Sequence, residues 1–226
     1  MCARFTLKST ADEIVEAFEF DDDDAHEFAQ RHTPRYNIAP SQLSLIVVQQ
    51  VARRRPAWAS WGLIPSWAKD ASIAHRTINA RSESASLKPS FRDAMRSRRC
   101  LVPTDGFFEW RGAGRQRQPM YFTLKSQQLM AFAGLWETWR DTTGHERVTF
   151  TVLTTTPSAD IDDVHDRMPV ILPRESWADW CDPTQPAEPL LRPLEAGRLQ
   201  RWDVDPRMNS PRVDGPLCVQ PLLTLF

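Results

Sequence analysis

Apolar and polar positions form short blocks through the middle of the chain, a pattern typical of strands. The stretch 43–51 is rich in Leu, Ile and Val and is bounded by residues that favour turns. Other short stretches have the same character, so the middle of the fold is predicted to be rich in β structure. Strands are expected over residues 5–7, 43–51, 119–124, 130–135 and 148–154.

Helical periodicity is clearest near the N-terminus. Thr10 and Glu13 form a capping-box pattern, and Ile14 with Phe18 gives an apolar face, which predicts a helix over residues 11–19. Shorter helical patterns predict two further helices, over residues 90–98 and 174–180. Prolines interrupt the segment 183–193, which is therefore not expected to form a continuous helix.

The four consecutive aspartates at 21–24 predict a solvated loop without chemistry of its own. Helices therefore flank a sheet without the regular alternation of strand and helix that a parallel α/β fold shows. The chain contains no internal repeat and no low-complexity linker. It is predicted to form a single α+β domain over residues 1–226.

Composition narrows the class of protein. The 226 residues are 41% hydrophobic and include nine tryptophans, enough for a sizeable core. No run of about 18 apolar residues and no secretory signal pattern occurs, so a cytoplasmic location is expected. The four cysteines lack a CxxC pair, which argues against a zinc site, and neither a metal nor a cofactor is expected. Core positions are predicted for Cys100, Cys181, Cys218, Trp136, Trp139, Trp177 and Trp180.

Charge is segregated along the chain although the net charge is only −1. Residues 1–30 carry two basic and nine acidic side chains, whereas residues 31–117 carry sixteen basic and five acidic ones. Of the 28 basic residues 24 are arginine, whose planar fork suits phosphate. The basic middle segment suggests a phosphate-bearing partner.

Cys2 becomes the first residue once Met1 is removed, and removal is expected when the second side chain is small. Its amine, with a reference pKa of ~7.7 to 8.0, and its thiol, at ~8.5, are then two nucleophiles on one residue. Such an aminothiol condenses with an aldehyde and closes to a five-membered thiazolidine. Taken alone, a cysteine at position 2 is more often an incidental small residue.

Reactive and rigid residues are concentrated in a few segments. These are MCARF at 1–5, RYNIAP at 35–40, WGLIPSW at 61–67 with INARSE at 78–83, PTDGFFEW at 103–110 and HDRMP at 165–169. Together, and in this order, they resemble the SOS-response-associated peptidase (SRAP) family over nearly the whole chain. The resemblance implies a barrel-like mixed sheet flanked by helices, and a monomer whose Cys2 links covalently to abasic sites in single-stranded DNA.

The resemblance also implies which residues assist Cys2. An abasic deoxyribose is mainly a closed hemiacetal, and opening it requires proton transfer, a role for which Glu109 and His165 match the family. The aromatic neighbours of Glu109 would bury it and raise its pKa, while a histidine exchanges protons near pH 7. Asn79 matches an asparagine that recognises the abasic site and could orient the aldehyde oxygen or the Cys2 amine.

Expected DNA contacts are of three kinds: phosphate binding, strand holding and wedging against bases. They are Arg4, Arg81 and Arg167 for phosphates, Asn37, Pro40 and Trp67 for the strand and its bases, and Thr154 for a further phosphate. The chain departs from the family at two positions. Ala3 replaces the usual glycine, where a Cβ would interfere if the position needed positive φ or a very close approach of DNA. Ala68 replaces a frequent second tryptophan, which would weaken the wedge.

The expected function is DNA repair through a thiazolidine cross-link that shields abasic sites, with possible self-cleavage of the Met1–Cys2 bond. One alternative is an N-terminal-nucleophile or Cys-His-Asn hydrolase that uses the Cys2 thiolate with His165 as base. Another is a single-stranded DNA-binding module without catalysis, which the charge segregation alone would support. The conjunction of Cys2, Asn79, Glu109 and His165 favours the cross-linking function.

Overall fold

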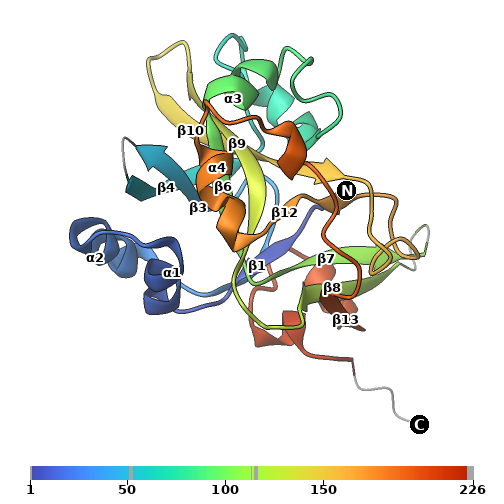
Figure 1. Cartoon of the computed structure of the whole chain (residues 1–226). Helices are drawn as coiled ribbons and strands as arrows, with labels where there is room; N and C mark the ends of the chain where they lie inside the picture. Colours follow the sequence, from blue (N-terminus) through green and yellow to red (C-terminus); the bar gives the residue numbers. More distant parts are fainter. Residues whose placement is uncertain (1, 51–52, 113, 115–116, 223–226) are drawn as a thin grey trace.

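The computed structural model describes residues 2–50, 53–112, 114 and 117–222, and its centre is a closed barrel (Figure 1). The barrel strands are β10 (Glu146–Thr155), β4 (Arg53–Trp61), β3 (Leu43–Gln50), β6 (Arg99–Thr104) and β9 (Met130–Arg140), each paired with the next and β9 with β10. The β10–β4 pair is parallel and the others are antiparallel. The predicted α+β fold with a mixed barrel-like core is confirmed.

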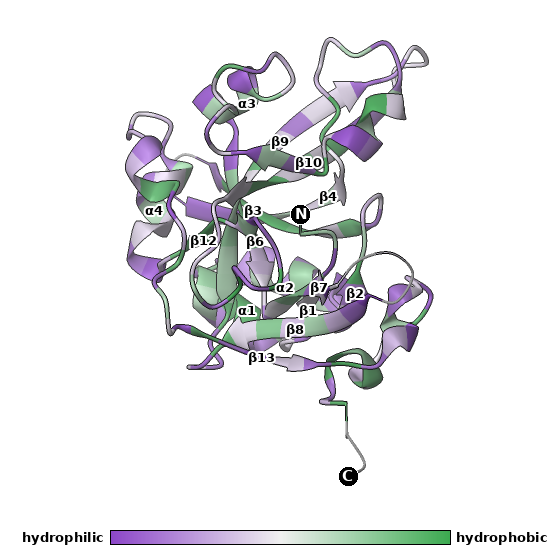
Figure 2. Ribbon diagram, turned by 90° about the vertical axis from the view of Figure 1, so that its right-hand side faces the viewer, coloured by the Kyte–Doolittle hydropathy of each residue, from purple (hydrophilic) through white to green (hydrophobic). Residues whose placement is uncertain are grey.

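A second sheet lies below the barrel in the views of Figures 1 and 2. Its order is β13 (Leu199–Asp203), β8 (Gln118–Leu124), β7 (Gly106–Arg111), β1 (Phe5–Leu7) and β2 (Arg35–Ile38). Because side chains alternate across a strand, this sheet contributes to two apolar clusters. Phe5 and Phe107 pack into the barrel core, whereas Phe108 and Tyr121 pack on the opposite face with Met208.

Short strands extend the barrel sheet at the end of β10. Strand β5 (Asn79–Arg81) pairs in parallel with β10, and β11 (Met168–Pro169) pairs antiparallel to it, while β12 (Ile171–Leu172) pairs with β9. Thr154 is in register with both Arg81 and Pro169. Segments far apart in the sequence therefore meet at the C-terminal end of β10.

Helices lie beside the two sheets (Figure 1). They are α1 (Ala11–Phe18), α2 (Asp22–Arg31), α3 (Arg92–Ser97) and α4 (Trp177–Cys181), with 3-10 turns η1 (Ala71–Arg76), η3 (Arg174–Ser176), η4 (Glu188–Leu190), η5 (Pro206–Asn209) and η6 (Pro216–Val219). The capping box of α1 is present, since Thr10 accepts from the backbone of Glu13 and Glu13 accepts from that of Thr10. Within the described ranges, no helix is long and apolar enough to cross a membrane.

The prediction of a solvated loop at 21–24 is wrong. Asp21 is the N-cap of α2 and accepts from the backbone of Asp24, and acidic residues in a first helical turn also interact favourably with the helix dipole. Asp24 is buried, and Arg55 of β4 binds its carboxylate through Nε at 2.9 Å and Nη2 at 2.7 Å. The aspartates therefore start a helix and join it to the barrel.

Most predicted strands and helices are confirmed with shifted ends, although Val51, the last residue of one predicted strand, lies outside the described residues. Strand β9 runs to Arg140 because it pairs with β10 along its whole outer half. The strands that were not predicted are β2, β4, β5, β6, β7, β11, β12 and β13. The cysteines at 100, 181 and 218 and the tryptophans at 139, 177 and 180 are buried, and Trp136 packs against the core.

Gly106 is required for the approach of β7 to β8. A Cβ there would lie 2.4 Å from the Tyr121 ring and 2.5 Å from the Phe122 carbonyl oxygen. We expect Gly106→Ala to lower the free energy of unfolding by ~2 to 3 kcal/mol, since overpacking forces side chains and backbone to shift. Urea denaturation would measure the loss. Gly215→Ala is the matched control, because nothing lies within 4 Å of its added Cβ, and an equal loss there would contradict the explanation.

Candidate active site

Cys2 lies buried just before β1, against the end of β5. Its carbonyl oxygen accepts a hydrogen bond from Asn79 Nδ2 at 2.7 Å, and its Sγ lies 3.7 Å from the Arg4 carbonyl oxygen. Asn79 Oδ1 is also buried and has no hydrogen-bond partner among the described residues. The Asn79 side chain is thus held through its Nδ2 atom, and its Oδ1 atom is a hydrogen-bond acceptor beside Cys2.

Glu109 is placed beside Cys2 by the pairing of β1 with β7. Phe5 is in register with Phe107, and the Phe108 N–H donates to the Arg4 carbonyl oxygen, so the same register sets Glu109 opposite Ala3. Alternation along β7 puts the Glu109 side chain on the Phe107 face, toward the barrel. It is 2% exposed, and burial raises its pKa to about 7, the direction expected from its apolar surroundings.

His165 lies in the connection between β10 and β11 and faces Glu109. Its Nε2 is 4.0 Å from Glu109 Oε2, and its Nδ1 accepts from the Arg167 backbone N–H at 2.9 Å. Burial lowers the pKa of His165, so the ring is neutral at pH 7. Nδ1 also lies 2.9 Å from Asp166 Oδ1, so which ring nitrogen of the neutral imidazole carries the proton depends on which of these two partners Nδ1 binds.

The structure brings together Cys2, Asn79, Glu109 and His165 at the seam between the two sheets. Burial raises the pKa of the Cys2 thiol well above its usual value, and the nearby Glu109 charge raises it further. The thiol is therefore neutral at pH 7. The group combines a neutral thiol, a carboxyl that titrates near neutrality and a neutral imidazole, which suits proton transfer more than thiolate attack.

Arg81 and Arg167 lie next to this group, at the end of β10. Asn79 and Arg81 share one face of β5, because they are two residues apart on a strand. Arg167 binds Glu83 through Nη1 to Oε1 at 2.6 Å and Nη2 to Oε2 at 2.8 Å, and Nη2 also donates to the Thr154 carbonyl oxygen at 2.6 Å. The Thr154 side chain is buried and lies 3.5 Å from the Ala80 carbonyl oxygen. Sequence reasoning gave Glu83 no role, and its partner is 84 residues away.

Arg4 and Asn37 lie on the other face of the second sheet. Arg4 Nη1 donates to Asn37 Oδ1 at 3.2 Å and to the Met208 carbonyl oxygen at 3.1 Å, and Nη2 donates to that of Asn209. The Asn37 amide donates to the carbonyl oxygens of Met208, Ser210 and Val213 and is fully buried. The structure therefore does not place these two side chains with the Cys2 group, and both hold the segment 208–213.

Pro40 and Trp67 lie in loops at the barrel ends. Residues 39–42 form a type II turn, with Pro40 before Ser41 at φ 73° and a hydrogen bond from Gln42 N–H to the Ala39 carbonyl oxygen. Trp67 is 56% exposed and is the kind of side chain that can stack on a base.

The structure bears on the two positions that depart from the family through the backbone at Ala3 and a loop contact at Ala68. Among the described residues other than glycine, positive φ occurs at Glu19, Ser41 and Gln127, so Ala3 needs no left-handed backbone. The Ala68 carbonyl oxygen accepts from Trp139 Nε1 at 2.8 Å, which anchors the loop that carries Trp67.

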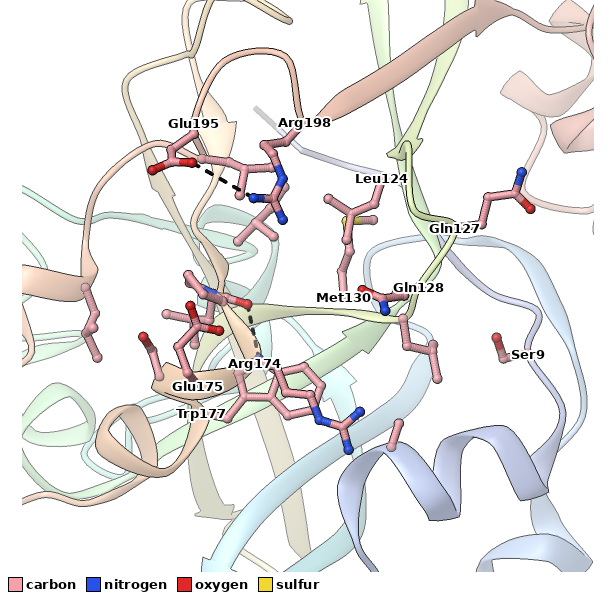
Figure 3. A pocket seen from close by; sticks show the side chains of 18 of the residues that line it. Ser9, Leu124, Gln127, Gln128, Met130, Arg174, Glu175, Trp177, Glu195 and Arg198 are labelled. Carbon is pink, nitrogen blue, oxygen red and sulfur yellow. Dashed lines mark hydrogen bonds and ion pairs between the residues drawn. The ribbon is translucent and has the colours of Figure 1, made fainter.

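A separate cavity of about 500 Å³ lies between α1, the turn 124–130 and the segment 171–177, and Figure 3 shows side chains that line it. Its lining includes Met130, Trp177, Arg174 and Arg198 but none of the residues predicted for catalysis or DNA contact. In the part of the chain that the structure describes, no group of three or more His, Cys, Asp and Glu side chains could hold a metal ion.

Known proteins resemble this chain over most of its length. "Abasic site processing protein YoqW" of Bacillus subtilis (strain 168) is 41% identical over 227 residues, covering 97% of this chain and 99% of that protein. "Abasic site processing protein HMCES" of Gallus gallus is 30% identical over 228 residues, covering 85% and 67%.

Solved structures share the fold. A crystal structure of a protein from Bacteroides thetaiotaomicron covers 98% of this chain and all of its own, with a TM-score of 0.88 and 26% identity. A crystal structure of a phage-related protein from Bordetella bronchiseptica covers 90% and 94%, with a TM-score of 0.67 and 29% identity. The family model described as "SOS response associated peptidase (SRAP)" matches residues 1–211, and the chain belongs to this family.

Proposed function

We propose that this protein repairs DNA by forming a covalent thiazolidine with abasic sites in single-stranded DNA through Cys2, after Met1 has been removed. The observation that carries the proposal is the convergence on Cys2 of the Asn79 amide, at 2.7 Å from its carbonyl oxygen, and of a carboxyl and an imidazole 4.0 Å apart. The names of the relatives YoqW and HMCES, both abasic site processing proteins, support it.

The proposed chemistry begins with ring opening. Protonated Glu109 donates its proton to the ring oxygen O4′ of the hemiacetal, the C1′ hydroxyl of the sugar loses its proton to water, and the C1′–O4′ bond breaks to give the open aldehyde. The Cys2 amine adds to C1′, and loss of water leaves an imine. The Cys2 Sγ then bonds to C1′ as the thiol proton passes to the imine nitrogen, closing the thiazolidine. His165 relays protons between the sugar oxygens and Glu109.

The raised pKa of the Cys2 thiol favours this chemistry over peptide hydrolysis. A cysteine hydrolase attacks as the thiolate, which burial disfavours here, whereas thiazolidine closure uses the thiol after the amine has reacted. Removal of Met1 is a separate step, by Cys2 acting on its own peptide bond or by a cellular aminopeptidase.

In this proposal the DNA strand passes the seam between the two sheets. Arg81 and Arg167 contact phosphates next to the abasic sugar, and Trp67 and Pro40 contact the bases. Arg4 contacts a phosphate farther along, with Asn37 positioning its guanidinium. Thr154 contributes to DNA binding indirectly, because its carbonyl oxygen accepts a hydrogen bond from Arg167 and so positions that guanidinium.

The test is incubation of the Met1-free protein with a single strand that contains one abasic site, followed by denaturing electrophoresis. A heat-stable shifted band is expected. The control strand carries a tetrahydrofuran abasic analogue, which has no aldehyde and should give no band. Absence of the band with the true abasic strand would refute the proposal, and a band with the analogue would refute the aldehyde chemistry.

A further inference from the structure

We propose that the Glu83 carboxylate occupies the phosphate-binding fork of Arg167 in the DNA-free protein, and that a DNA phosphate displaces it. Glu83 then sets the affinity for the strand without touching the reacting atoms. This inference rests on the proposed function, because the displacing group is a phosphate of the single strand.

The hydrogen bonds of Arg167 leave little room for a second anion. A guanidinium has five N–H groups. Glu83 takes one from each terminal nitrogen, at 2.6 and 2.8 Å, and the Thr154 carbonyl oxygen takes the other N–H of Nη2. Nε is buried and has no hydrogen-bond partner among the described residues. A phosphate could therefore reach one Nη1 N–H, but it could bind the two-pronged fork only if Glu83 left.

The two partners differ in how firmly they are held. The Arg167 side chain is 12% exposed, and its residue is fixed by the bond to Thr154 and by the backbone bond to His165. The Glu83 side chain is 50% exposed, so it can swing into solvent. The hydrogen bond from Arg167 is the main cause of the lowered pKa of Glu83, which is therefore ionised at neutral pH. The exchange moves the carboxylate and leaves the guanidinium in place.

The exchange weakens DNA binding by the wild-type protein. Binding replaces one carboxylate on Arg167 with one phosphate, and the released Glu83 charge stays beside the strand, near Arg81. Arg167 thus adds little net attraction while Glu83 is present. Without the Glu83 charge, the same guanidinium would neutralise one more phosphate and release one more counterion from the strand.

The experiment measures equilibrium binding of an intact single strand, without an abasic site, by fluorescence anisotropy over a series of salt concentrations. Glu83→Gln is expected to bind roughly fivefold more tightly at ~0.1 M salt. The plot of log affinity against log salt should steepen by about 0.7, the value for one phosphate on a single strand. Glu83→Asp keeps the charge on a shorter arm and should give a smaller gain at unchanged net charge.

Repeating Glu83→Gln in an Arg167→Gln background isolates the contact, because the gain should then disappear. An equal gain in both backgrounds would show a general charge effect and overturn the exchange. Weaker binding by Glu83→Gln and Glu83→Asp would overturn it too, since Glu83 would then position Arg167 for DNA. Failure of the wild-type protein to bind the strand at all would instead count against the proposed function.

Discussion

Cys2→Ser is expected to abolish the heat-stable adduct with abasic single strands while leaving the rest of the site intact. Serine keeps a free α-amine after removal of Met1, so an imine with the aldehyde still forms. Its hydroxyl is a far weaker nucleophile than a thiol, so the imine stays open and hydrolyses on heating. The adduct band should fall below detection without reductant and reappear when borohydride is present to trap the imine.

Cys2→Ala is the matched control for this substitution, since it also keeps the amine and removes every nucleophilic side-chain atom. It should behave like Cys2→Ser in both conditions. A heat-stable adduct from either variant without reductant would show that the thiol is dispensable and would refute the aminothiol mechanism. Loss of the borohydride-trapped band as well would mean that the substitutions disturb DNA binding or amine placement.

Glu109→Gln is expected to slow adduct formation by ~10²- to 10⁴-fold, the usual loss when a general acid is removed. The amide has nearly the same shape but cannot carry the proton. Because the Glu109 pKa is about 7, the wild-type rate should decline above pH 7 as the carboxyl ionises, while the amine still gains nucleophilicity. Single-turnover gel assays from pH 5 to 9 would show that decline in the wild type and its absence in the variant.

Affinity for an abasic analogue strand separates catalysis from binding, and it should change less than threefold in Glu109→Gln. A parallel loss of affinity and rate would reassign Glu109 to DNA binding.

The pH dependence of protein stability gives a second test of the Glu109 pKa. The pKa of Glu109 is raised in the folded protein, so the folded state holds the proton more tightly, and stability is lost as pH rises from about 4.5 to 7. Glu109→Gln lacks this loss, so its free energy of unfolding should exceed that of the wild type by about 3 kcal/mol at pH 8 and by only about 1 kcal/mol at pH 5.

Local patterns predicted the parts of the fold whose cause is local. The capping box at Thr10 and the apolar stretch that became β3 both occur as expected, because a capping box and a run of Leu, Ile and Val are signals carried by residues close together in the sequence. Strand β4 was missed because it begins with three arginines and contains Pro56. Its pairing with β3 and the bond from Arg55 to Asp24 determine its structure, and neither is visible in a window of sequence.

The candidate site shows the same division. Glu109 was singled out by its aromatic neighbours and by the family motif, but its burial comes from the pairing of β1 with β7, which turns its side chain toward the barrel. Arg4 and Asn37 lie in two other segments that carry the family resemblance. Strand alternation nevertheless puts their side chains on the opposite face of the second sheet from Glu109. Glu83 lay inside a quoted motif without a role, because the arginine that binds it is 84 residues away.

The sequence by itself determined the reactive groups available to this protein: an aminothiol once Met1 is lost, a carboxyl in an aromatic setting, a histidine that can titrate and a surplus of arginine in the middle of the chain. Tertiary structure decided their states. Burial at the seam of two sheets raises the pKa values of Cys2 and Glu109 and lowers that of His165. The fold also brings Glu83 against Arg167, whose guanidinium binds its carboxylate. Desolvation and hydrogen bonding depend on which distant segments pack together, and residue identity alone does not specify that packing.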